Sequence, residues 1–164
     1  MHIHSLFEYK PGILMIGSDD GLSIFNTATF NHELVTPSET DPSSLSDKFV
    51  YPIFKDREGG IWIGTYFGGV NYLPPSGRMF ERYTCSRYAN SVNGNIIGEI
   101  TEDKHGNIWI ASDDGGLNVL DAKTGLFKTF LPNASVHSIS YYNIHGLCWD
   151  DDQLWAGTYS AGLN

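Results

Sequence analysis

Basic residues are scarce in this sequence, and long hydrophobic runs are missing from it. Lysine and arginine number 10 among 164 residues, against 19 aspartates and glutamates, which gives a formal net charge of −9. An acidic surface of this kind repels phosphate groups, so the composition argues against nucleic-acid binding. The longest apolar runs have four residues, as at 13–16, whereas a membrane-spanning helix needs about 18. We therefore expect any membrane attachment to come from parts of the protein outside this sequence.

Residues with the chemistry of metal binding or nucleophilic catalysis are also few. The two cysteines, Cys85 and Cys148, are too few for a disulfide framework and lack the spacing of metal ligands. The six histidines form no zinc-binding motif. A Gly-x-Ser-x-Gly nucleophile elbow and a phosphate-binding glycine loop are both missing. We expect no catalytic residue, no metal and no cofactor in this segment.

Glycine and aromatic residues, by contrast, are abundant. The chain has 18 glycines, and Phe, Trp and Tyr together make up 13% of it. This combination suits short β-strands joined by tight turns. Hydrophobic residues account for 41%, which is enough for a packed core. The composition therefore predicts an all-β domain.

A unit of about 47 residues recurs four times along the chain. A tryptophan recurs at intervals of 47 and 46 residues, an aspartate recurs at intervals of 47, and a glycine follows each tryptophan by seven positions. A fourth, degenerate copy begins the chain, with Leu14 at the tryptophan position. The marker residues of the three clear copies are Asp56, Trp62, Gly69, Asp103, Trp109, Gly116, Asp150, Trp155 and Gly162.

Each unit is predicted to form four short antiparallel strands. The segments 61–63 and 108–110 are apolar at consecutive positions, which is typical of strands covered on both faces. Sheets stacked face to face around an axis cover one another in this way, as in the blades of a β-propeller. We name the four strands of a blade a, b, c and d from the axis outward.

The repeats predict a partial β-propeller of about four blades, which form one fragment of a single propeller domain. The expected blades span approximately residues 3–34, 49–83, 95–131 and 142–164. The last blade is expected to stop inside strand c, so the chain looks like a piece of a larger propeller. Terminal blades would present apolar faces to water, and we expect the segment to self-associate through these faces.

The repeat resembles that of the two-component regulator propellers. The resemblance is carried by the pattern Asp-x-x-Gly-x-Ile-Trp-Ile-Gly-Thr-x-x-Gly-Gly-(Leu/Val)-Asn, which is clearest at 56–71 and 103–118. The Ser-Leu-Ser-Asp element at 44–47 also matches the family. Blade three departs from the pattern with Ala111-Ser112, and the last blade lacks the turn glycine and is one residue shorter. These departures indicate that the motif is a scaffold and not a shared catalytic site.

The resemblance implies the sensor region of a hybrid two-component regulator of gut bacteria. In that family the propellers lie in the periplasm, ahead of a membrane helix and a histidine kinase, and usually respond to oligosaccharides. By this resemblance the segment senses a ligand, has no enzymatic activity, and belongs to a parent anchored in the inner membrane.

Two alternatives remain open. One is a fragment of a propeller glycosidase or lyase, whose similar turns typically begin with serine two residues before the aspartate. Phe54 and Thr101 at these positions argue against that alternative. The other is a protein-binding propeller with no small ligand.

The aspartates and tryptophans of the repeat are interpreted as structural. A short carboxylate at Asp56 or Asp103 caps the amides of the a–b turn, and the following glycine takes a positive φ. The tryptophans are expected in the core, with each indole N–H bonded to a backbone carbonyl.

The candidate ligand site follows from the order of the strands. The a–b and c–d turns share one end of the propeller, and the b–c and longer d–a loops share the other. Loops on a rigid scaffold carry recognition, and aromatic faces with carboxylates suit a neutral oligosaccharide. The predicted ligand-binding residues in these loops are Tyr66, Phe67, Asp113, Asp114, Tyr141, Tyr142 and Tyr159.

Overall fold

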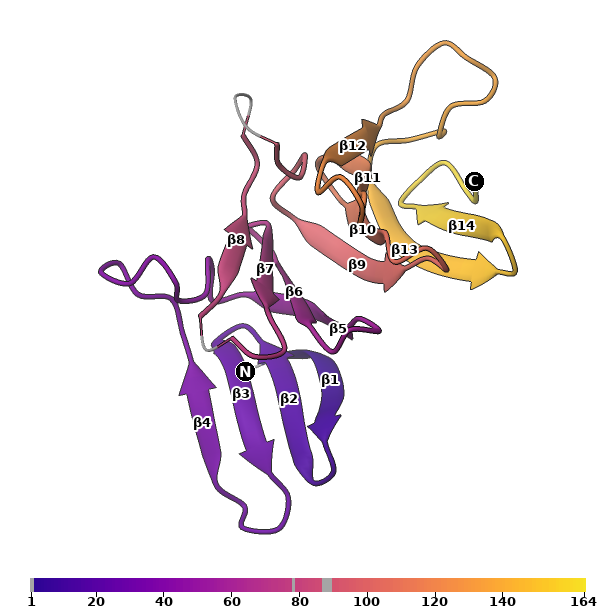
Figure 1. The fold of residues 1–164 in the computed structure, drawn as a ribbon. Helices are drawn as coiled ribbons and strands as arrows, with labels where there is room; N and C mark the ends of the chain where they lie inside the picture. The colour runs from indigo at the N-terminus through magenta and orange to yellow at the C-terminus, as the bar shows by residue number, and fades with distance from the viewer. Residues whose placement is uncertain (1, 78, 87–89) are drawn as a thin grey trace.

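The computed structural model describes residues 2–77, 79–86 and 90–164, and it confirms the all-β partial propeller. Three antiparallel sheets have four strands each and a fourth has two (Figure 1). We call these sheets blades one to four in chain order. The described parts of the chain contain no helix with the length and apolarity that a bilayer crossing requires.

The strands of each blade follow one another in space as they do in sequence. Their bounds are β1 (Ile3–Lys10), β2 (Ile13–Ser18), β3 (Gly21–Asn26) and β4 (His32–Val35) in blade one; β5 (Val50–Lys55), β6 (Ile61–Thr65), β7 (Val70–Leu73) and β8 (Glu81–Tyr83) in blade two; β9 (Ile97–Glu102), β10 (Ile108–Ser112), β11 (Gly116–Leu120) and β12 (Phe127–Phe130) in blade three; and β13 (Ile144–Asp150) and β14 (Gln153–Thr158) in blade four. A single antiparallel bridge from Gly157 to Leu163 marks where strand c begins in blade four.

The four a strands line the axis. β1 lies beside β5, β5 beside β9 and β9 beside β13, so the sheets fan out in an arc from these inner strands (Figure 1). This is the arrangement expected when right-handed twisted sheets stack around a common centre.

The core lies between the blades, which explains the strands that are apolar at consecutive positions. In β6, Ile61 and Ile63 pack against Met15 of blade one, whereas Trp62 packs into a cluster with Ile97 of blade three. A third cluster joins blades three and four. Each fully buried side chain of this size contributes roughly 1.5–3 kcal/mol relative to an exposed one. The interfaces between blades, and not any single sheet, therefore hold the fold together.

Blades one and four each have one face that no described sheet covers. Leu6 and Leu34 on blade one are 65% and 47% exposed, and Trp155 on blade four is 38% exposed. Trp62, at the equivalent position of blade two, is 4% exposed. The prediction that all three repeat tryptophans are core residues is therefore wrong for Trp155, because the sheet face on which it lies has no neighbour.

An asparagine fixes the connection into each of the last three blades. The side-chain oxygens of Asn71, Asn118 and Asn164 accept the backbone N–H of residues 46, 93 and 140, at 2.9, 3.0 and 2.7 Å. Asn71 and Asn118 are fully buried. We call this contact the asparagine pin. It ties strand c of a blade to the loop that enters the same blade.

Candidate functional site

The a–b turns are built around an aspartate whose carboxylate has structural partners. Asp56 Oδ1 accepts the N–H of Gly60 at 2.7 Å, and Asp56 Oδ2 accepts the indole N–H of Trp62 at 2.8 Å. In blade three the N–H groups of His105 and Asn107 and the Trp109 indole bind Asp103 in the same way. The turn-capping role is present as predicted. The indole partner differs from the prediction, because the aspartate carboxylate, and not a backbone carbonyl, accepts the indole N–H.

Blade four lacks this arrangement. Asp150 lies within β13 opposite Gln153, and the turn consists of Asp151 and Asp152, with Asp151 at a φ of 51°. The segment is one residue shorter than in blades two and three, so a two-residue hairpin replaces the capped turn. Asp150 therefore marks the repeat in the sequence but does not cap a turn as Asp56 and Asp103 do.

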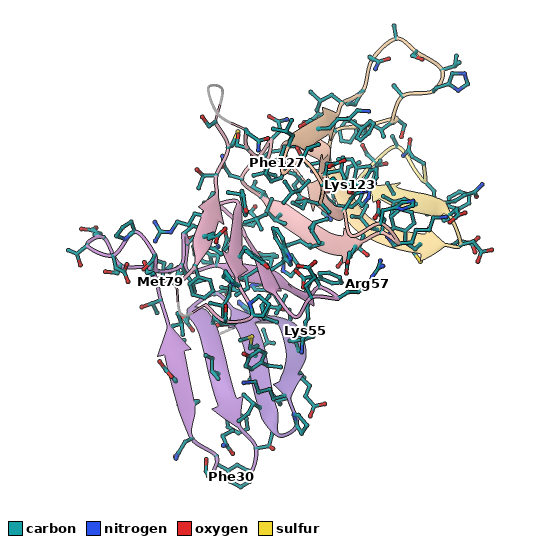
Figure 2. The ribbon with its side chains drawn as sticks, in the orientation of Figure 1. Phe30, Lys55, Arg57, Met79, Lys123 and Phe127 are labelled. Atoms are coloured by element: carbon teal, nitrogen blue, oxygen red, sulfur yellow. The ribbon has the colours of Figure 1, made fainter. Side chains whose placement is uncertain are left out.

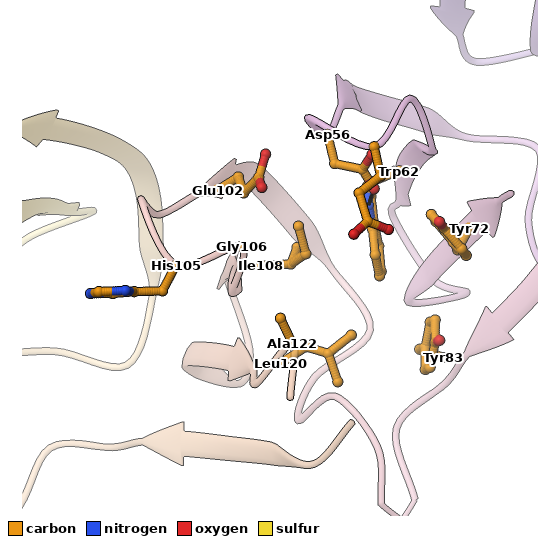
Figure 3. Close-up of a pocket in the computed structure, with 11 residues that line it drawn as sticks. Asp56, Trp62, Tyr72, Tyr83, Glu102, His105, Gly106, Ile108, Leu120 and Ala122 are labelled. Atoms are coloured by element: carbon orange, nitrogen blue, oxygen red, sulfur yellow. Dashed lines mark hydrogen bonds between the residues drawn. The ribbon is translucent and has the colours of Figure 1, made fainter. Parts of the chain in front are cut away.

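A cavity of about 250 Å³ opens at the same end, between blades two and three. Figure 3 shows aromatic side chains of blade two on one wall and apolar side chains of blade three on the other. The carboxylate of Glu102 at its rim is engaged by Arg57, with Nε 3.4 Å from Oε1. Arg57 and Lys55 both lie at this end of the molecule (Figure 2). The cavity was not predicted from the sequence, and the Glu102 carboxylate that lines it already has a partner in Arg57.

The b–c and d–a loops share the opposite end, which we call the loop end. The amide of the first b–c residue donates to the carbonyl at the start of the same blade in all four blades: Asp19 to His2, Tyr66 to Phe49, Asp113 to Ile96, and Tyr159 to Asn143, at 3.3, 3.1, 2.9 and 3.0 Å. These bonds place one side chain per blade at the same point of the loop end.

Residues at two positions of the repeat meet there. Positions 4, 51, 98 and 145 lie on the a strands, at intervals of 47 residues, and carry His, Tyr, Gly and His. Positions 19, 66, 113 and 159 begin the b–c loops and carry Asp, Tyr, Asp and Tyr. We call the set with polar or aromatic side chains the axial band: His4, Asp19, Tyr51, Tyr66, Asp113, His145 and Tyr159.

Contacts link the band across blades one and two. His4 Nε2 lies 2.6 Å from Asp19 Oδ1, and the His4 ring stacks on that of Tyr51 with centroids 4.0 Å apart. The Tyr51 ring lies 5.4 Å from that of Tyr66. Hydrogen bonds from His4 and His2 hold the pKa of Asp19 below its ordinary value. Burial, aided by Tyr66, Asp19 and Asp113, raises the pKa of Tyr51.

The band continues across blades three and four. Asp113 Oδ2 lies 3.5 Å from His145 Nε2, and the His145 ring lies 5.4 Å from that of Tyr159. Burial is the main influence on Asp113, and with the charge of Asp114 it raises the pKa of this carboxyl despite the nearby His145. Asp113 Oδ1 is buried and has no hydrogen-bond partner. The band therefore contains one carboxylate oxygen that is shielded from solvent and unpaired among the described residues.

The structure brings some of the predicted site residues together in the axial band and gives others contacts elsewhere. Tyr66, Asp113 and Tyr159 belong to the axial band, and Phe67 packs edge-on against Tyr66 with centroids 4.6 Å apart. Asp114 has a structural role, because its carboxylate accepts the N–H groups of Asn95 and Ile96 and the Ser112 hydroxyl. Tyr141 and Tyr142 pack on each other at 4.6 Å, and the Tyr142 carbonyl accepts the N–H of Gly116.

Four members of the band were not among the predicted site residues: His4, Asp19, Tyr51 and His145. Three of them lie on a strands, whereas the prediction considered only loops. The signal that could have identified them is the 47-residue interval itself, which places 4, 51, 98 and 145 at one level of the propeller.

Comparison with protein families gives two matched segments. Residues 44–67 and 91–114 each match the family model described as two component regulator propeller. Both segments run from a d–a loop through strands a and b into the b–c loop. No curated protein sequence matches the chain.

Solved structures share the fold over nearly the whole chain. The extracellular domain of a proposed hybrid two-component system from Bacteroides thetaiotaomicron aligns with a TM-score of 0.77 and 25% identity, covering 97% of this chain and 19% of that one. The extracellular domain of a proposed one-component system from the same organism aligns at 0.76 and 22%, covering 98% and 21%. PorZ, of the type-IX secretion system of Porphyromonas gingivalis, aligns at 0.67 and 16%, covering 99% and 24%. The chain thus spans about a fifth of the first two structures, and the resemblance read from its motif is confirmed.

Proposed function

Because the chain carries repeats of the two-component regulator propeller family, we propose that it is a ligand-sensing segment of a hybrid two-component regulator. The extracellular location of the domain in the relative at 25% identity supports a position outside the cytoplasm. We place the segment in the periplasm, in a parent anchored in the inner membrane. Occupancy of the propeller would be passed to a histidine kinase elsewhere in that parent.

The ligand that we propose is a neutral oligosaccharide bound at the loop end. The observation that carries this proposal is the axial band, in which aromatic rings and carboxylates alternate across all four blades. Aromatic faces pack against the C–H groups of a sugar ring, and carboxylates accept hydrogen bonds from its hydroxyls. Tyr159 is 72% exposed and offers such a face to solvent.

A catalytic role is not part of this proposal. The two aspartates of the capped turns, Asp56 and Asp103, are engaged by indole and backbone N–H groups and contribute to the fold. The segment would bind without turnover. Release of product from a chromogenic glycoside panel would favour the glycosidase alternative.

Calorimetric titration of the 164-residue chain with a panel of neutral oligosaccharides tests the proposal. Tyr66→Ala and Tyr159→Ala should each weaken the binding of a glycan that the wild type takes up by about 5- to 50-fold, in line with the loss of one aromatic contact. Phe30→Ala, at an aromatic residue 76% exposed in the c–d turn of blade one at the opposite end, serves as the control. Failure of every glycan to bind, together with capture of a protein by the loop end, would support the protein-binding alternative.

A further inference from the structure

The cavity between blades two and three lies at the end of the molecule opposite the loop end, and the proposed oligosaccharide site does not use it. Its aromatic wall and its apolar wall face each other, as Figure 3 shows, and are formed by Trp62, Tyr72, Tyr83, Ile108 and Leu120. The ring of His105, which also lines the cavity, is directed away from the aromatic wall (Figure 3). The volume of about 250 Å³ has room for a small organic group, since one water molecule takes up about 30 Å³ of the liquid.

Two polar side chains of this cavity are not required by the repeat. The residue that pairs with the tryptophan of strand b is Tyr72 in blade two and Val119 in blade three. A blade therefore forms with an aliphatic residue at this place, and the fold does not need the phenol of Tyr72. Glu58 in the a–b turn is exposed, and its carboxylate has no hydrogen bond or ion pair with the described residues. The scaffold explains neither side chain, although both line the cavity.

Negative charge dominates around the cavity. Burial is the main cause that raises the pKa of the Tyr72 phenol. Three carboxylates raise this pKa further, those of Asp56, Glu58 and Glu81. Burial, aided by Glu81, also raises the pKa of Tyr83. An anion is therefore unfavourable at this place, whereas the same potential attracts a cation.

The described basic side chains nearest the cavity have other partners. Arg57 binds Glu102, with Nε 3.4 Å from Oε1, and also donates to the backbone carbonyl of Lys104 at 3.1 Å. The ammonium group of Lys104 pairs with a carboxylate of blade four, and that of Lys55 lies over an aromatic ring of blade one. Arg78 lies outside the described residues. These contacts leave the free carboxylate of the cavity without a cation from the described part of the chain.

We propose that this cavity binds the end of an alkyl chain that carries a guanidinium or ammonium group. The alkyl part packs between the aromatic rings and Leu120, and the cation lies against an aromatic face and pairs with Glu58. A small amine or guanidine has this chemistry, and so has an arginine or lysine side chain of a partner polypeptide. The inference goes beyond the proposed function and does not rest on it, because the two sites lie at opposite ends of the propeller.

Titration of the 164-residue chain with two charged probes tests the site. The readout is the chemical shift of the Trp62 indole N–H, which is bonded to Asp56 beside the cavity. One probe is free butylguanidinium, and the other is a capped tripeptide with arginine between two glycines. The same tripeptide with citrulline in place of arginine keeps the shape and removes the charge. It should bind at least about 10-fold more weakly than the arginine peptide.

Two substitutions locate the probe in the cavity. Glu58→Gln removes the charge with little change of volume and should weaken the binding of both charged probes by about 5-fold. Glu33→Gln, at an exposed position of β4, is its control and should stay within about 2-fold of wild type. Ala122→Phe places a ring at the apolar edge of the cavity and should weaken binding at least about 10-fold, with Ala28→Phe in the c–d turn of blade one as control. Thermal melting reports whether each variant is folded.

The outcomes separate the two sources of the cation. Binding of butylguanidinium supports a site to which a small cation suffices, and binding of the arginine peptide alone supports a side chain of a partner polypeptide. The inference is overturned if neither charged probe binds the folded wild type, or if the citrulline peptide binds as tightly as the arginine peptide. Wild-type affinity in both Glu58→Gln and Ala122→Phe would also overturn it. Tyr159→Ala at the loop end should leave these affinities unchanged, so failure here and failure of the oligosaccharide proposal remain distinct.

Discussion

Trp62 donates its indole N–H to the carboxylate of Asp56, and Trp109 repeats this bond to Asp103, at 2.8 and 3.1 Å. The bond joins the a–b turn to the second residue of strand b. Both tryptophans also pack between neighbouring blades. In each blade the aspartate carboxylate therefore couples the conformation of the a–b turn to the packing of that blade against the next.

Removal of this carboxylate should destabilise the fold. Asp103→Ala leaves the Trp109 indole and two turn amides without an acceptor, and we expect a loss of about 2–3 kcal/mol in unfolding free energy. For a chain of this size that corresponds to a fall in melting temperature of roughly 5–10 °C. Asp150→Ala is the matched control, because Asp150 is exposed and lies outside any capped turn. Equal losses in the two variants would contradict the assigned role.

The stability of the fold should depend on pH through the carboxyl group of Asp103. Burial is the largest influence on this carboxyl and favours its neutral form, but the bonds from Trp109, Asn107 and His105 together outweigh it and lower its pKa from the ordinary 3.8. A lowered pKa in the folded state stabilises the protein above the unfolded value, and this stability is lost as the pH falls through the folded pKa. Urea unfolding of wild type and Asp103→Asn should therefore converge between about pH 5 and pH 2. Parallel curves through this window would show that another group titrates.

The asparagine pin should contribute at least as much to the free energy of unfolding as the capped a–b turn does. Asn118 accepts the N–H of Asn93 and the Thr129 hydroxyl and donates to the Asn93 carbonyl. Asn118→Ala leaves these groups unsatisfied in a buried place, and we expect a loss of about 2–4 kcal/mol by chemical denaturation. Asn31→Ala, an exposed position, should change stability by less than about 0.5 kcal/mol.

The uncovered faces of the terminal blades make self-association a prediction for the 164-residue chain. Leu6 and Leu34 lie on one such face, and we propose that a second copy covers it. Leu6→Ser combined with Leu34→Ser should shift the mass measured by light scattering toward the monomer. Val136→Ser, which removes an exposed apolar side chain from a loop, should leave the mass unchanged. A wild type that stays monomeric at every concentration would exclude association.

The fold could be predicted because the residues that determine it recur at the same positions of each repeat. The consecutive apolar residues at 61–63 have one explanation, coverage of both faces, and β6 has it from blades one and three. Trp155 could not be placed in the same way, because its burial depends on a neighbouring sheet and not on its own segment. The turn after Asp150 could not be predicted from the repeat either, because the loss of one residue changes the type of hairpin.

The site could be predicted only in part. Tyr66, Asp113 and Tyr159 stand out as loop residues, whereas His4 and Tyr51 lie within strands and appear polar or amphipathic in isolation. Their significance comes from stacking between blades, a contact between residues 47 apart.

The asparagine pin also divides each connecting segment into two parts with different freedom. After the residue whose N–H is bound by the asparagine, the chain runs directly into the next a strand. Before that residue, stretches such as 36–42 and 131–137 lie exposed. Since the apolar contacts between blades set their angle and spacing, changes of length or side chain in these stretches should leave the arrangement of the blades intact. A lineage of such repeats can therefore vary its outer stretches, while the pin keeps the last residues of each connection in place.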